Sequence, residues 1–272
     1  MVHRRIDLPT QGAYLETYFC DYSDRLKNSL SRPVILICPG GGYGYTTDRE
    51  AEPIALAFAS RGYHVAVLRY PCAPTRYPAA LVSLCQAVLW LRSHAGEYYM
   101  DASRLCVAGF SAGGHLAASL GVFWHRDFLH ELVGCTAGDI RPQALLLGYP
   151  VIHDGPAGDG YTLRNLLGEE AAADAVAFQC LDRHVTDRTP PTFLWSTDTD
   201  ELVPIVNSID FSAALCRAGV SQELHIYSLG EHGLSLANAA TEDTLPGKAR
   251  VCPDCEGWVD MAVRWLKRQF GV

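Results

Sequence analysis

The amino-acid sequence predicts an α/β fold with a mostly parallel central sheet and helices on both faces. Short apolar runs rich in β-branched residues alternate with stretches of helical periodicity along most of the 272 residues. This alternation is typical of β-α-β units, whose helices connect parallel strands and cover the sheet. A glycine-rich turn, residues 109–113, also lies between a predicted strand and a predicted helix. We expect a single α/β domain over residues 1–272, since no repeat or long linker divides the chain.

The predicted strands are short apolar runs that end at glycine, proline or polar residues. The run 34–38, Val-Ile-Leu-Ile-Cys, ends at Pro39 and three glycines, and the run 64–70 is followed by Pro71. Such runs are consistent with strands that are buried on both faces of a sheet. The predicted strands are 34–38, 64–70, 105–108, 144–147, 192–195 and 223–227.

The predicted helices follow from apolar residues spaced three and four apart and from signals at helix ends. The first, 48–60, is expected to be opened by Thr47 with Glu50 three residues on, as in a capping box, and closed by Gly62. The others are 79–93, 112–123, 208–218 and 258–270.

Two stretches, 125–141 and 153–188, do not fit the alternation of strands and helices. We interpret both as insertions at the upper edge of the sheet, where they would shape a substrate pocket.

Composition and charge exclude several classes of protein. The chain is 49% hydrophobic and 19% charged, which excludes a disordered protein. With 22 basic and 30 acidic residues its net charge is −8, which argues against nucleic acid or an anionic membrane as the main partner. No stretch approaches the roughly 18 apolar residues of a membrane span, and no secretory signal follows the N-terminus. The ten cysteines lie partly inside apolar runs and form no disulfide framework, so we expect a cytoplasmic, reduced enzyme.

The strongest chemical signal is the sequence Gly109-Phe110-Ser111-Ala112-Gly113 between a predicted strand and a predicted helix. A serine on so sharp a turn is strained, and the residues two before and two after it must be small. The turn raises the hydroxyl above the sheet and directs the N-terminus of the next helix toward it. Ser111 is therefore the candidate nucleophile.

A serine hydroxyl needs a base, and in this arrangement the chain order is serine, acid, histidine. Of the seven histidines after Ser111, only His232 lies in a loop bracketed by glycines just after the last predicted strand. His225 lies within that strand and His115 within a helix, so neither is free to approach the serine. His232 is the candidate base.

The acid is expected in the loop that follows the predicted strand 192–195. Asp198, Asp200 and Glu201 compete there, and Leu202-Val203-Pro204 anchors the chain directly after them. This position favours Asp200, with Asp198 next and Glu201 third.

Hydrolysis of an ester also requires hydrogen-bond donors for the developing oxyanion. The backbone N–H of Ala112 supplies one, and Gly41 or Gly42, in the glycine run after the strand 34–38, supplies the other. Tyr43 follows this run and is a candidate substrate-binding residue. It belongs to a group of loop tyrosines that could stack on sugar rings, namely Tyr43, Tyr45, Tyr70 and Tyr77.

Cofactor signals are weak. Cys252-Pro253-Asp254-Cys255 is a lone C-x-x-C, and no second pair of ligands stands at a spacing usual for zinc. The sequence carries neither G-x-G-x-x-G nor a P-loop, so no metal and no nucleotide cofactor is implied.

These motifs resemble the α/β-hydrolase superfamily, in particular its small acetyl-esterase branch related to bacterial xylan esterases and feruloyl-esterase-like hydrolases. The matching segments extend from about residue 33 to the end of the chain. They include Cys38-Pro39-Gly40-Gly41-Gly42-Tyr43, Asp48-Arg49-Glu50-Ala51-Glu52-Pro53, residues 109–117, 190–195 and 200–204, and Glu231-His232-Gly233. Ser196-Thr197 depart from the family's more usual His-Thr, and Cys252-Pro253-Asp254-Cys255 is also unusual.

The resemblance implies a serine carboxylesterase with Ser111 as nucleophile, Asp200 as acid and His232 as base. It also implies acetyl esters, often of plant-polysaccharide fragments, as substrates, and hence a small-molecule or oligosaccharide ester as the partner. Two alternatives remain: a peptidase of the prolyl-oligopeptidase type, for which the chain has little room for a gating domain, and a catalytically inactive binding module on the same fold. A homodimer is compatible with the sequence, but no residue identifies an interface.

Overall fold

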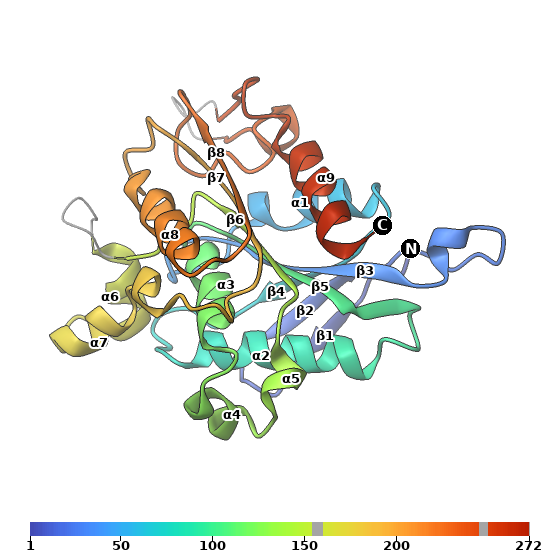
Figure 1. The fold of residues 1–272 in the computed structure, drawn as a ribbon, viewed down its shortest axis with the longest axis horizontal. Coiled ribbons are helices and arrows are strands. Elements are labelled where there is room, and N and C mark those ends of the chain that lie inside the picture. Colours follow the sequence, from blue (N-terminus) through green and yellow to red (C-terminus); the bar gives the residue numbers. More distant parts are fainter. Residues whose placement is uncertain (154–159, 245–249, 272) are drawn as a thin grey trace.

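The computed structural model describes residues 1–153, 160–244 and 250–271. In this part of the chain, eight strands form one sheet in the order β1-β2-β4-β3-β5-β6-β7-β8 (Figure 1). Strands β3 to β8 are parallel, and β2 runs antiparallel to both β1 and β4. The strands are β1 Arg5–Asp7, β2 Tyr14–Tyr18, β3 Arg32–Cys38, β4 His64–Arg69, β5 Met100–Phe110, β6 Ala144–Gly148, β7 Thr192–Thr197 and β8 Gln222–Tyr227.

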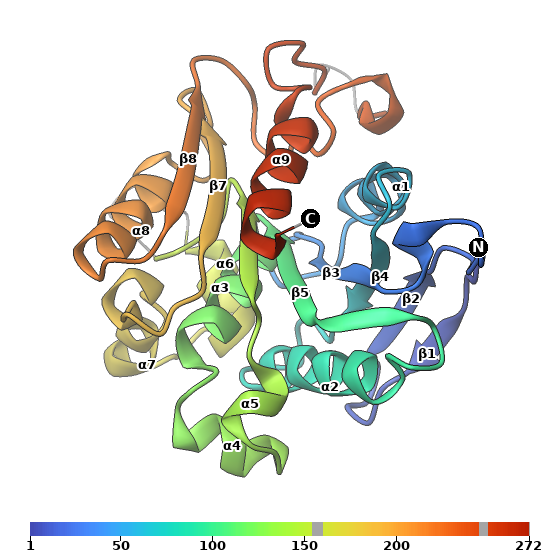
Figure 2. The same cartoon turned by 45° about the vertical axis from the view of Figure 1, so that its right-hand side comes forward.

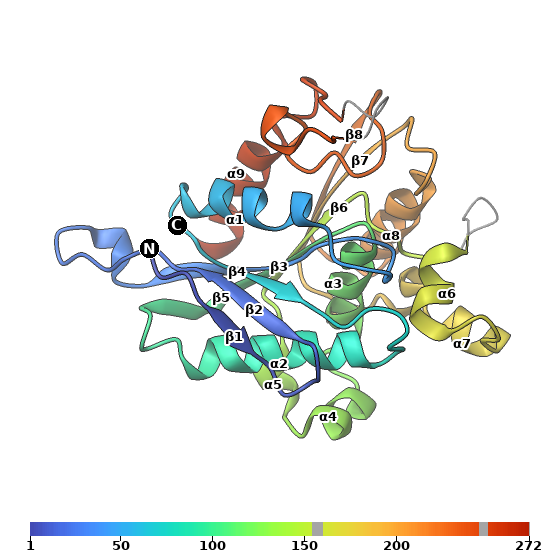
Figure 3. The same cartoon turned by 180° about the vertical axis from the view of Figure 1, so that it is seen from behind.

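Helices cover both faces of this sheet, which confirms the predicted fold class. Helices α1 and α9 lie on one face, and α2, α3 and α8 lie on the other (Figures 2 and 3). The bounds are α1 Glu52–Ala59, α2 Ala79–Ser93, α3 Ala112–Phe123, α4 Asp127–Val133, α5 Ala137–Ile140, α6 Tyr161–Leu167, α7 Ala173–Phe178, α8 Val206–Arg217 and α9 Trp258–Phe270, with short 3-10 turns at Lys27–Ser29, Asp48–Glu50, Leu181–His184 and Ala239–Thr241.

The central strands are buried on both faces, as their continuous apolar runs predict. In β3, Val34 and Leu36 pack toward α2 and α3, whereas Ile35 and Ile37 pack toward α1 and α9. This alternation follows from the two-residue period of a strand. The sheet is therefore covered on both faces, and the loops of the site described below follow the carboxyl ends of its strands.

The structure corrects the prediction for residues 125–141. This stretch forms α4 and α5, which lie beside α2 (Figures 1 and 2) and contribute nothing to the pocket described below. The reason is the direction of α3, which begins at the carboxyl edge of the sheet. Its C-terminal end, and the chain that follows, therefore lie at the opposite edge.

The second predicted insertion, residues 153–188, does contribute to the pocket. Its residue His153 and the start of α6 do line the pocket, while residues 154–159 lie outside the described residues. No helix among the residues described here combines the length and hydrophobicity needed to cross a membrane.

Candidate active site

Ser111 occupies the sharp turn between β5 and α3 that the sequence predicts. Its backbone has φ +54° and ψ −123°, a region that non-glycine residues rarely adopt. The surrounding backbone holds this conformation: Ser111 N–H donates to Gly148 O at 3.0 Å, and Ser111 O accepts from the N–H groups of His115 and Val151 at 3.1 Å. Hydrogen bonds to the end of β6, to the loop that follows it and to α3 therefore hold Ser111 in this strained conformation.

The two glycines of this turn are required by close packing. A Cβ atom on Gly113 would lie 2.0 Å from the carbonyl oxygen of Cys38, and one on Gly109 would lie 2.1 Å from that of Gly113. Both distances are far below van der Waals contact, and both clashes are with backbone. The small residues on either side of Ser111 thus allow β3, β5 and α3 to meet directly beneath the serine.

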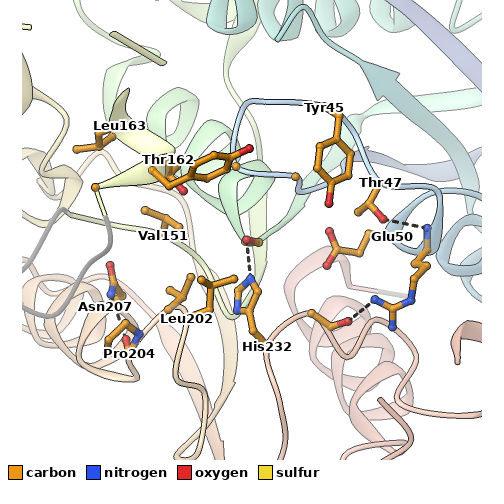
Figure 4. Close-up of a pocket in the computed structure, with 18 of the residues that line it drawn as sticks. Tyr45, Thr47, Glu50, Val151, Thr162, Leu163, Leu202, Pro204, Asn207 and His232 are labelled. Atoms are coloured by element: carbon orange, nitrogen blue, oxygen red, sulfur yellow. Dashed lines mark hydrogen bonds between the residues drawn. The ribbon is translucent and has the colours of Figure 1, made fainter. Parts of the chain in front are cut away.

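Three of the predicted residues come together at the carboxyl edge of the sheet, and Figure 4 shows His232 among the residues that line the pocket there. His232 Nε2 lies 2.7 Å from Ser111 Oγ, and His232 Nδ1 lies 2.7 Å from Asp200 Oδ2. An ionised carboxylate only accepts hydrogen bonds, so Nδ1 carries the proton and Nε2 is left to accept from the serine hydroxyl. In this arrangement the imidazole can take the serine proton.

Asp200 is also fixed by the backbone of its own loop. Its Oδ1 accepts from the N–H groups of Leu202 and Val203 at 3.0 and 2.9 Å, and the side chain is buried. The other two candidate acids, Asp198 and Glu201, are exposed. Among the three carboxylates that compete in the sequence, Asp200 is the one beside His232.

The predicted donors of an oxyanion hole, Gly41, Gly42 and Ala112, surround Ser111. Gly41 has φ +128° and Gly42 has φ +60°, and a Cβ on Gly41 would lie 2.2 Å from Tyr45 O, so only glycine fits there. Ala112 is the first residue of α3, and its N–H therefore has no acceptor within the helix. Gly41 and Gly42 line the same pocket as Ser111 and His232.

The pocket has a volume of about 230 Å³ and two unlike sides (Figure 4). On one side of His232 most of the labelled side chains are apolar, including Val151, Leu163 and Leu202, although Thr162 and Asn207 lie among them. On the other side lie polar groups that include Thr47 and Glu50. An ester bound over Ser111 would place its acyl group and its alcohol group in different surroundings.

The structure corrects the prediction for Tyr43. Its side chain is only 2% exposed and does not line the pocket, so a sugar ring cannot stack on it. Tyr43 packs against Tyr70 and His115 beneath the glycine loop, and its hydroxyl bonds to His115 Nδ1 at 3.0 Å. The apolar ring is buried because the loop turns it inward at φ +55°. Among the four loop tyrosines, Tyr45 is the one that lines the pocket.

His115 supports this loop from below. Its Nε2 donates to Gln179 O at 3.2 Å, and its Nδ1 accepts from the Tyr43 hydroxyl, so both nitrogens are satisfied in the neutral form. Burial lowers the pKa of His115 to about 4.

We expect this histidine to make folding sensitive to acid. Below pH 6.5 the unfolded chain binds a proton that the folded chain excludes down to about pH 4, so the free energy of unfolding falls over that window by roughly 3 kcal/mol. Urea unfolding at several pH values tests this, with His115→Gln as the comparison because glutamine can replace both hydrogen bonds. The slope of stability against pH should be smaller in the variant by about 1 kcal/mol per pH unit; equal slopes would assign the acid sensitivity to other groups.

Sequence reasoning missed the placement of Glu50. Thr47 Oγ1 does accept from Arg49 N–H, at 3.4 Å, but Glu50 does not reach back to cap a helix. Residues Asp48–Glu50 form a separate 3-10 turn, and α1 begins only at Glu52, beside Pro53. Proline favours the first turn of a helix, and this was the signal that Glu50 precedes the helix. Its carboxylate points into the site instead (Figure 4).

The C-x-x-C cysteines lie outside the pocket. Their sulfur atoms are 3.3 Å apart, and both contact the carbonyl oxygen of Leu229. Within the described ranges, no group of three or more side chains suited to hold a metal ion is present.

Comparison with known proteins identifies relatives of this chain. The sequence profile of the BD-FAE family matches residues 22–145. Among curated relatives, the endo-1,4-beta-xylanase B of Butyrivibrio fibrisolvens is 33% identical over 78% of this chain, and the acetylxylan esterase of Xylanibacter ruminicola is 27% identical over 76%. The chain spans 34% and 42% of the lengths of these two relatives.

A solved structure covers nearly the whole chain. The carboxylesterase Cest-2923 from Lactobacillus plantarum is 30% identical, superposes with a TM-score of 0.82, and is matched over 98% of this chain and 97% of its own. This chain belongs to the esterases of the α/β-hydrolase superfamily.

Proposed function

We propose that this chain is a serine carboxylesterase that hydrolyses short acyl esters, acetyl esters above all. The observation that carries the proposal is the hydrogen-bonded series from Ser111 through His232 to Asp200, with both distances at 2.7 Å, at the floor of a pocket. The alternative of an inactive binding module is not favoured, because such modules typically lack one of these three residues, and here each is in hydrogen-bond range of the next.

The reaction proceeds in two steps. His232 Nε2 takes the hydroxyl proton as Ser111 Oγ attacks the ester carbonyl, and the N–H groups of Ala112 and of Gly41 or Gly42 stabilise the oxyanion. His232 then gives this proton to the leaving alcohol, which yields the acyl-enzyme. Water attacks the acyl group by the same route, again with His232 as base, and releases the acid. Asp200 stabilises the imidazolium and maintains the Nδ1–H tautomer.

The size of the pocket supports a short acyl group. Its volume of about 230 Å³ is below the roughly 300–1,000 Å³ of pockets for drug-sized ligands. The kinship with an acetylxylan esterase and a xylanase supports acetylated xylan fragments as natural substrates.

A series of p-nitrophenyl esters with acyl chains of two to eight carbons tests the proposal. We expect kcat/KM to be highest for acetate or propionate and at least about tenfold lower for octanoate, because a long chain exceeds the pocket. Release of acetate from acetylated xylo-oligosaccharides would extend the result to the natural class. A rate that rises with chain length would overturn the short-acyl assignment, and hydrolysis of a matched amide at a similar rate would favour a peptidase.

A further inference from the structure

Glu50 is a buried carboxylate beside the reacting groups that the mechanism above does not use. Its side chain is 2% exposed, yet it borders the pocket that contains Ser111. Its Oε2 accepts from Gly40 N–H at 2.7 Å, and its Oε1 accepts from the Tyr149 hydroxyl at 2.7 Å. A buried carboxylate is costly unless its oxygens are hydrogen-bonded, and these two short bonds offset that cost.

The first of these bonds reaches the oxyanion loop. Gly40 directly precedes Gly41 and Gly42, and a Cβ on Gly40 would lie 2.7 Å from Glu50 Oε2 and 2.8 Å from Ser111 Cβ. Glu50 therefore occupies the space directly beneath the start of the loop. Its bond to Gly40 N–H fixes the Pro39–Gly40 peptide, which directly precedes the peptides that carry the N–H groups of Gly41 and Gly42.

The second bond reaches the histidine loop through Tyr149. The Tyr149 hydroxyl donates to Glu50 and accepts from Ser235 N–H at 2.9 Å, three residues after His232. The Tyr149 ring also packs edge-on against the His232 ring, with centroids 5.2 Å apart. Burial and the nearby Glu50 carboxylate raise the pKa of Tyr149 well above its usual range, so the phenol keeps the proton that it donates.

Arg49, the neighbour of Glu50, also links this turn to the loop that carries His232. Its guanidinium donates to Gly233 O at 2.8 Å and to Thr241 O at 2.8 and 2.7 Å, and its own carbonyl accepts from the Ser235 hydroxyl. The turn Asp48–Glu50 thus contacts both the oxyanion loop and the loop that carries His232.

We propose that Glu50 is a positioning residue that holds the oxyanion loop and the His232 loop in one fixed relation, so that the oxyanion donors and the base act on the same carbonyl group. This role rests on the serine esterase mechanism proposed above.

Glu50→Gln is the informative substitution, because it keeps the volume of the side chain and removes one acceptor. Gly40 N–H and the Tyr149 hydroxyl both donate to Glu50, whereas a glutamine amide would oppose one of them with a donor. The amide NH₂ would then either face Gly40 N–H, donor against donor, or face the Tyr149 hydroxyl and leave its proton without the acceptor it has in the wild type. A misplaced oxyanion donor weakens interactions made in the transition state more than those made with bound substrate.

The experiment measures kcat and KM for p-nitrophenyl acetate and the Ki of trifluoroacetone, which adds to a nucleophilic serine and forms an oxyanion. We expect Glu50→Gln to lower kcat and raise Ki by roughly ten- to a hundredfold, below the 10²–10³ of a deleted donor, with KM within about twofold of wild type. Glu52→Gln is the matched control, since this exposed residue two positions on accepts from Tyr18 OH and does not line the pocket. It should leave all three quantities unchanged.

A second variant keeps the proposal testable if Glu50→Gln folds poorly. Tyr149→Phe retains the Glu50–Gly40 bond but removes the link to Ser235, and it should also lower kcat with little change in KM. Unchanged kcat and Ki in a folded Glu50→Gln protein, or a change in KM alone, would overturn the role of Glu50. If the wild type is active and Ser111→Ala is inactive, such a result would overturn the role of Glu50 alone and leave the serine esterase mechanism unaffected. Inactivity of the wild type toward every ester would overturn both proposals.

Discussion

Replacing Ser111 with alanine is expected to lower kcat for p-nitrophenyl acetate by about 10⁴- to 10⁶-fold. The reason is that Ser111 Oγ is the atom within 2.7 Å of His232 Nε2, and without it no acyl-enzyme can form. Activity that remains would come from binding and from the oxyanion donors alone. Stopped-flow measurement should show a burst of p-nitrophenol in wild type if deacylation is slower than acylation, and none in the variant.

Ser119→Ala provides the control for this substitution. Ser119 lies on α3, the helix that begins directly after Ser111; it is buried and donates to His115 O at 2.8 Å, away from His232. Its removal should leave kcat within about twofold. Retention of more than about a tenth of the wild-type rate in Ser111→Ala would contradict a serine nucleophile and would require another group in the pocket to attack the ester.

The sequence predicts the parallel strands and the helices that cover them, because the burial of each of these elements is visible in its own pattern of apolar residues. Each buried strand carries a continuous apolar run, and the predicted helices 79–93, 112–123 and 258–270 coincide with α2, α3 and α9. The edge strand β1 and its neighbour β2 were not predicted. They are short, and β1 is largely exposed, so neither carries a long apolar run.

The meeting of Ser111, Asp200 and His232 was also predictable, because each follows the carboxyl end of a parallel strand. Parallel strands bring those ends to one edge of the sheet, and this does not depend on the structure of the segments that connect the strands. The roles of Tyr43 and Glu50 depend instead on how irregular loops pack. The sequence predicts that Glu50 caps a helix, because no local pattern indicates that Gly40 N–H and the Tyr149 hydroxyl donate to its carboxylate.

The second large effect is expected for Asp200→Asn, which should lower kcat by about 10⁴-fold. The side-chain oxygen that accepts from Leu202 and Val203 N–H must remain an acceptor, so the asparagine NH₂ group would face His232 Nδ1. Nδ1 would then have to accept, and the ring proton would move to Nε2. In that tautomer Nε2 cannot take the serine proton.

Two neighbouring acids serve as controls in the same assay. Asp198→Asn and Glu201→Gln remove the same charge from the same loop, but both side chains are exposed and should leave kcat within about twofold. If the loss at Asp200 were only an effect of net charge, all three variants would behave alike. A large loss of kcat in Asp200→Asn, with none in the two neighbouring variants, requires the directional bond to His232 Nδ1. A large loss of kcat in Asp198→Asn instead would identify Asp198 as the acid.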